Sequence, residues 1–118
     1  MKNKPGVCMV TTGPGSTNAV TGVAGAWVES IPVIYISGQV KRETIANYKK
    51  HRQLGIQEIN TIGIVNKITK YSVEITEPNN IAYELEKCFY EVANGRPGPV
   101  WLSIPLDIQS STIDENDL

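Results

Sequence analysis

The sequence has little of what several large classes of function require. It holds two cysteines, Cys8 and Cys88, and one histidine, none at a spacing typical of metal ligands. The formal net charge is −1, which gives no reason to expect nucleic acid as a partner. No apolar run approaches the roughly 20 residues that a membrane span needs. We therefore predict no metal site of its own, no nucleic-acid or membrane partner, and free thiols buried in a cytoplasmic protein.

What the sequence does have is the composition of one globular domain. Hydrophobic residues make up 41% of the 118, and charged residues only 19%. This length and composition suit a single domain with an apolar core. Residues 110–118 are polar and acidic, so we assign residues 1–109 to the domain and 110–118 to a linker or frayed tail.

Short apolar segments alternate with helical patterns along the chain. Strands are predicted near residues 6–11, 32–37, 70–75 and 99–104, and major helices near 17–29 and 79–94. Residues 41–55 are polar and predict a loop, and 57–67 are only loosely helical in pattern. Because the strands are apolar on both faces, we predict an α/β fold with a parallel sheet covered by helices on both sides.

The two major helices differ in the faces they present. Ser16, Thr17 and Asn18 are residue types that cap a helix N-terminus, and Gly22, Gly25 and Ala26 give the first helix a face of small residues. Both tryptophans, Trp27 and Trp101, are predicted in the core. Apolar stripes at helical spacing are formed by Ala19, Val20, Val23, Ala24, Trp27 and Val28, and by Ile81, Leu85, Cys88, Phe89 and Val92.

The segment Thr11–Asn18 joins the first predicted strand to the first predicted helix, and it contains Gly13-Pro14-Gly15. Ligands gather at such junctions in open α/β sheets, and the N-terminus of a helix offers free N–H groups. The residues alone favour a phosphate site only weakly, because the spacing matches neither common phosphate-binding fingerprint. A simple tight turn is the alternative.

The run Val10–Asn18 is similar to the Thr-Ser/Thr-Gly-Pro-Gly-Ala/Ser-Thr-Asn motif of acetolactate synthases and their relatives. Further matches follow in order at Ile31-Pro32, Ser37–Val40, Ile56–Glu58, Ile68–Tyr71 and Gly95–Gln109. Over nearly its whole length, the chain resembles the pyrimidine-binding domain of these thiamine-diphosphate-dependent enzymes.

The resemblance implies a set of cofactor contacts. Gly13, Pro14, Gly15 and Asn18 match positions that contact or frame the aminopyrimidine ring, and Gly38 and Gln39 match the strand end that lines the same cleft. Gln57 matches a glutamine that points into the active site. The resemblance also implies that the diphosphate and magnesium are held by another domain, and that the enzyme is a homodimer or homotetramer acting on a 2-oxo acid such as pyruvate. A flavin is left open.

In this family a glutamate that precedes the Gly-Pro-Gly segment activates the cofactor, and no residue here matches it. Glu29 lies at the wrong end of its helix, and Glu58 is interpreted as an acidic residue complementing a helix dipole. The expectation is an N-terminally truncated domain, inactive alone, within a carboligase that forms carbon–carbon bonds. A decarboxylase or lyase of the same family and a non-catalytic interaction module are the alternatives.

Two departures from the family put the substrate in doubt. Ile56 stands where acetolactate synthases usually have phenylalanine, and the connection from Val40 to Gly55 is longer than theirs. That connection contains the basic run Tyr48–Arg52, which is either a solvated loop or a contact for an anionic or phosphorylated substrate. His51 is assigned to the solvated surface.

Overall fold

The computed structural model describes residues 4–114, and these form a four-stranded sheet between two layers of helix. The strands are β1 (Gly6–Val10), β2 (Val33–Gln39), β3 (Tyr71–Glu74) and β4 (Val100–Pro105). Their order is β1-β2-β4-β3, and every pairing is parallel. The predicted parallel α/β fold is therefore confirmed.

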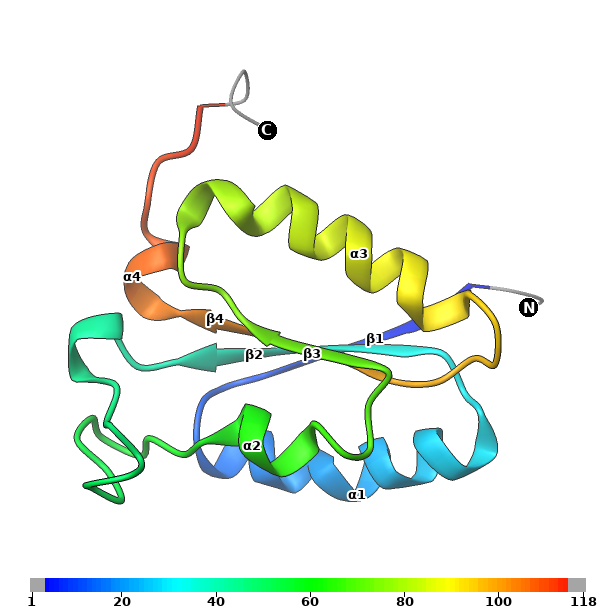
Figure 1. Cartoon of the computed structure of the whole chain (residues 1–118), viewed down its shortest axis with the longest axis horizontal. Coiled ribbons are helices and arrows are strands. Elements are labelled where there is room, and N and C mark those ends of the chain that lie inside the picture. The colour runs from blue at the N-terminus through cyan, green and yellow to red at the C-terminus, as the bar shows by residue number, and fades with distance from the viewer. Residues whose placement is uncertain (1–3, 115–118) are drawn as a thin grey trace.

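Helices cover both faces of the sheet, as Figure 1 shows. α1 (Pro14–Glu29) and the short α2 (Thr61–Val65) lie on one face, and α3 (Ile81–Ala93) lies on the other. Two 3₁₀ turns lie in the connections, η1 (Arg42–Thr44) after β2 and η2 (Pro78–Asn80) after β3. A last helical turn, α4 (Leu106–Gln109), follows β4. No helix in residues 4–114 has the length and apolar character that crossing a membrane would require.

The core is divided by the sheet into two apolar clusters. On the α3 side, Cys88 and Val92 pack against Ile34, Val100 and Leu102. On the α1 side, Val23 and Val65 pack against Tyr35 and Trp101, whose rings stack at 5.2 Å between centroids. Successive residues of β4 thus serve opposite faces, which is the reason a central parallel strand must be apolar throughout.

Several side-chain predictions are wrong in part. Trp101 is fully buried and donates from Nε1 to Ser37 Oγ, but Trp27 is 40% exposed near the end of α1. Phe89 is 56% exposed on α3, and Cys8 is only half buried, whereas Cys88 is fully buried. For Trp27 and Phe89, the helical period alone does not indicate how far the opposing element extends, and Cys8 lies on β1, an edge strand of the sheet.

α1 also begins earlier than its sequence predicted. Gly13, with φ of 60°, occupies the N-cap, and Pro14 occupies the first turn, so Ser16, Thr17 and Asn18 lie inside the helix rather than capping it. Proline is pre-organised for a first helical turn, and this preference starts the helix before the polar residues. Instead of capping the helix, the buried Ser16 hydroxyl donates to the Thr11 carbonyl oxygen.

The remaining boundaries are close to the expected ones. α3 ends at Ala93, and Gly95 follows in the left-handed region at φ of 67°, as the Asn94-Gly95 pair predicts. Only Thr61–Val65 of the loosely helical segment 57–67 forms a helix, and its N-cap Asn60 accepts a bond from the Gly63 N–H. Residues 110–114 form no regular element, and the rest of the predicted tail lies outside the described residues.

Candidate functional site

The four strands end at one edge of the sheet, and the candidate site residues gather there. β1, β2 and β4 point toward this edge, on the left in Figure 1, where α1 begins and α4 follows β4. The Gly13-Pro14-Gly15 turn follows β1, and Gly38 and Gln39 are the last residues of β2. Ligand sites of open α/β sheets form at this edge because the chain leaves the strands there in loops.

The Gly13 turn lies directly against the segment that carries Gln57. A Cβ atom on Gly13 would overlap the Gln57 carbonyl oxygen, so only glycine allows the two backbones to approach this closely. Gln57 itself has φ of 58°, a left-handed conformation that costs a non-glycine residue free energy. The structure thus brings together two site residues that are separated by more than forty positions in the sequence.

The Gln39 side chain bonds to three separate segments at this edge of the sheet. Its side chain is 4% exposed, and its Oε1 accepts from the Thr12 hydroxyl at 3.0 Å. Its Nε2 donates to the Ile59 carbonyl oxygen at 3.2 Å and to Glu74 Oε2 at 3.1 Å. The amide therefore connects the turn after β1, the segment after Gln57 and the end of β3, and protein groups already occupy its donors and acceptor.

Glu58 fixes the long connection that precedes Gln57. Its side chain is 6% exposed, and its Oε1 accepts from the Ala46 N–H at 2.6 Å and the Tyr48 hydroxyl at 2.7 Å. Its Oε2 accepts from the N–H groups of Leu54 and Gly55 at 2.7 and 2.8 Å. The prediction that Glu58 complements a helix dipole is wrong, because α2 begins only at Thr61 and the carboxylate lies inside the loop.

These hydrogen bonds determine the charge state of Glu58. Burial raises the pKa of this carboxyl, but three backbone N–H groups and the Tyr48 hydroxyl outweigh it, so the pKa lies below its ordinary value. Glu58 is therefore ionised at neutral pH. Burial raises the pKa of Tyr48 most, and the hydrogen bond to Glu58 raises it further. The phenol therefore stays protonated and serves as the donor.

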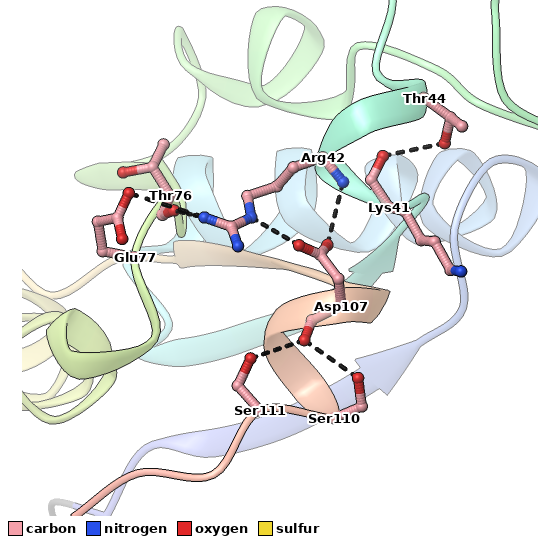
Figure 2. Close-up of polar contacts among 8 residues, drawn as sticks. All are labelled: Lys41, Arg42, Thr44, Thr76, Glu77, Asp107, Ser110 and Ser111. Carbon is pink, nitrogen blue, oxygen red and sulfur yellow. Dashed lines mark hydrogen bonds and ion pairs between the residues drawn. The ribbon is translucent and has the colours of Figure 1, made fainter.

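A second polar cluster joins three loops at this edge. We call Arg42, Thr76, Glu77 and Asp107 the Arg42 cluster, and Figure 2 shows the guanidinium between the other three. Arg42 Nε donates to Asp107 Oδ2 at 2.6 Å, its backbone N–H donates to Asp107 Oδ1 at 3.0 Å, and Nη1 donates to the Thr76 carbonyl oxygen. The hydrogen bonds from Arg42 lower the pKa of Asp107. The cluster thus ties the loops after β2 and β3 to α4.

A hollow of about 740 Å³ opens beside these loops. Gly38, Gln39 and Ile56 line it, whereas Gly13, Pro14 and Gln57 do not. Pro14, Asn18 and Gln57 are exposed. Most of the other lining residues stand within the quoted motifs, although none was assigned a role: Val10, Thr11, Thr12, Ser37, Val40, Ile104, Leu106 and Gln109. Met9 and Ile36 lie outside those motifs.

Comparison with known proteins identifies the family of this chain. Residues 1–64 match the family described as thiamine pyrophosphate enzyme, N-terminal TPP binding domain. Over 111 residues, which are 94% of its length, this chain is 40% identical to an acetolactate synthase of Arthrospira platensis. It covers 18% of that protein.

Two further relatives show the same pattern. A probable acetolactate synthase large subunit of Methanocaldococcus jannaschii is 41% identical over 92% of the chain, which covers 17% of the relative. Acetolactate synthase isozyme 1 large subunit of Escherichia coli is 39% identical over 94%, covering 19% of the relative. The chain spans less than a fifth of the length of these relatives. It belongs to the thiamine pyrophosphate enzyme family, as an N-terminal TPP-binding domain.

Proposed function

We infer that this chain forms the pyrimidine-binding face of a thiamine-diphosphate-dependent enzyme of the acetolactate synthase type. The complete enzyme forms carbon–carbon bonds from a 2-oxo acid such as pyruvate. The observation on which this depends most is the contact between the Gly13 turn and the Gln57 carbonyl at the carboxyl edge of a parallel sheet. The curated relatives, which carry the name acetolactate synthase, support the reaction class.

The residues at this edge fit a flat aromatic ring with a polar rim. Gly13 and Gly15 let the Gln57 backbone and the Thr11 side chain pack closely against this turn, and the exposed Pro14 offers an apolar surface at the start of α1. Gly38 leaves open the space between the Thr12 N–H and the Gln109 amide, where a Cβ would lie 3.6 and 3.7 Å from their nitrogens. When bound, thiamine diphosphate supplies a carbanion nucleophile that this protein's own side chains cannot provide.

Each site residue has a proposed task. The Gly13–Gly15 backbone and Asn18 frame the ring, and Gln57, held in its left-handed conformation, directs an exposed amide toward the reacting groups. Gln39 acts by holding the loops together, because its amide already bonds Thr12, Ile59 and Glu74. The diphosphate and its magnesium are held by another domain.

The partner proposals follow from the same assignment. The enzyme is a homodimer or homotetramer in which the cofactor lies between this domain of one subunit and the diphosphate domain of another. The 118 residues alone do not catalyse the reaction. They are part of a cytoplasmic protein that needs no nucleic-acid or membrane partner.

The test is a Gln57→Ala substitution in the complete protein that contains these residues. Because the Gln57 side chain is exposed, we expect a loss of turnover of roughly tenfold or more with a melting temperature close to wild type. Asn94→Ala removes an equally exposed amide beyond the end of α3 and serves as the matched control. The carbon–carbon bonded product formed from pyruvate or another 2-oxo acid is measured by mass spectrometry.

Two results would count against the proposal. One is wild-type protein that forms no carbon–carbon bond from any 2-oxo acid when thiamine diphosphate and magnesium are present. The other is a Gln57→Ala variant whose lost activity is matched by lost stability, because the residue would then serve the fold.

A further inference from the structure

Positive charge is concentrated in one short stretch of this nearly neutral chain. Five of its eleven lysines and arginines lie in residues 41–52, together with a single acid, Glu43. Arg42 belongs to the Arg42 cluster. The others are Lys41, Lys49, Lys50 and Arg52. We call residues 49–52, which also include His51, the basic turn, and all four are exposed.

The backbone of the basic turn is held in place from within. The Asn47 carbonyl oxygen accepts from the N–H groups of Lys50 and His51 at 2.8 and 2.9 Å, and Asn47 Oδ1 accepts from the Lys49 N–H at 3.1 Å. On either side, Ala46 and Leu54 donate to the buried Glu58 carboxylate. The cationic side chains therefore extend from a fixed backbone.

Among residues 4–114, the basic turn forms no ion pair. Both ion pairs found among residues 4–114 involve Arg42. Glu58, the carboxylate around which this loop folds, is buried, and its two oxygens bond three backbone N–H groups and Tyr48. Exposed charge of one sign raises the local concentration of ligands of the opposite sign.

The chain leads directly from the basic turn to the candidate site. Gly55 packs so closely on Val40 that a Cβ there would lie 2.8 Å from the valine side chain. Ile56 lines the 740 Å³ hollow, and Gln57 lies against Gly13. Figure 1 shows this loop beyond the end of β2, at the edge of the sheet where α1 begins.

We propose that the basic turn binds a phosphate group of the substrate that reacts at this site. The proposal rests on the proposed function and narrows its substrate class: one of the two reactants bears a phosphate in addition to the reacting carbonyl. One or two donors satisfy the single charge of a carboxylate. Two lysines and an arginine suit a phosphate, which carries about two charges and accepts the arginine fork in bidentate fashion.

The experiment follows backbone amide signals of the full 118-residue chain by NMR while inorganic phosphate is added at constant ionic strength. Acetate is titrated in parallel as a singly charged anion. We expect phosphate to shift the signals of residues 47–54 at lower concentration than acetate does. In Lys49→Gln/Lys50→Gln, phosphate binding should weaken roughly fivefold, because each exposed ion contact contributes a fraction of a kcal/mol to about one.

The matched control is Lys4→Gln/Lys67→Gln, which removes two exposed lysines outside the loop. Equal weakening in both variants, or phosphate and acetate acting alike, would overturn the proposal. The titration needs no cofactor, so its result does not depend on the result of the test of the proposed function. Thiamine-dependent shifts at Gly13 and Gln57 test that function, and phosphate-dependent shifts at residues 47–54 test this proposal.

Discussion

At the scale of single residues, a substitution of Gly13 tests its contact with the Gln57 carbonyl, on which the site depends. In Gly13→Ala, the new methyl group would occupy the position of the Gln57 carbonyl oxygen, and alanine would also have to adopt φ of 60°. Backbone strain of this kind costs about 1–3 kcal/mol, and the overlap adds to it. We expect a loss of at least that size in the free energy of urea unfolding.

Gly25→Ala is the matched control for this substitution. Gly25 lies inside α1, and within the described chain no atom beyond the adjacent residues and the helix's own backbone lies within 4 Å of the position of an added Cβ. Alanine should therefore raise the free energy of unfolding by about 0.5–1 kcal/mol, as expected for glycine replaced in a helix. Equal effects of the two substitutions would show that the Gln57 contact does not restrict Gly13.

Sequence patterns predicted some of these residues well and others poorly. The Gly13-Pro14-Gly15 turn can be predicted from the local sequence, since glycine permits positive φ and proline fixes its own φ. The left-handed backbone of Gln57 depends on contact with a turn more than forty residues away, and no local pattern contains that information. Glu58 was misassigned for the same reason, because its partners are the N–H groups of a loop without periodicity.

At the scale of elements, the loop from Lys41 to Ile59 is held by Glu58. In Glu58→Gln, the amide replaces one acceptor oxygen with a donor that faces backbone N–H groups, so charged hydrogen bonds are lost. We expect trypsin to cut after Lys49, Lys50 and Arg52 about ten times faster in native protein, with sites identified by mass spectrometry. Glu43→Gln, exposed on η1, removes the same charge as a control. Cleavage at the same rate in both variants would contradict the assigned role.

The Arg42 cluster should make stability depend on pH in the acid range. Because the pKa of Asp107 is lowered in the folded chain, its contribution is present above the ordinary value of about 4 and is lost as the pH falls through the folded value. Asp107→Asn should therefore lower the melting temperature at pH 7 by roughly a few degrees. The difference should shrink as the pH falls below about 4, and a difference that stays constant as the pH is lowered further would contradict the ionic role.

Element type followed from the sequence more securely than element boundaries did. The four apolar segments became four parallel strands, because continuous β-branched runs suit a sheet covered on both faces. The start of α1 was misplaced by residues that look like caps, since Pro14 begins the helix before them. α4 was not anticipated, because four residues are too few to show a helical period.

At the scale of the whole molecule, the edge strand β1 leaves apolar side chains exposed to solvent. Within residues 4–114, β1 pairs only with β2, and its Val7 and Met9 are 60% and 75% exposed. Leu106 beside the hollow is 53% exposed. Exposed apolar surface and an edge strand favour association. We expect light scattering at tens of micromolar protein to give the mass of a dimer or larger, and a monomer mass would contradict this.

The most direct test of the account is an NMR titration of the 118-residue chain with thiamine diphosphate. The account predicts amide shifts concentrated at Gly13, Gly15, Asn18, Gly38 and Gln57. Because the chain provides only one side of the cofactor site, those shifts should grow through the millimolar range without saturating at micromolar concentration. Shifts centred elsewhere, for example on Trp27 and Arg96 at the opposite edge of the sheet, or none at the Gly13 turn, would contradict the assignment of the pyrimidine face.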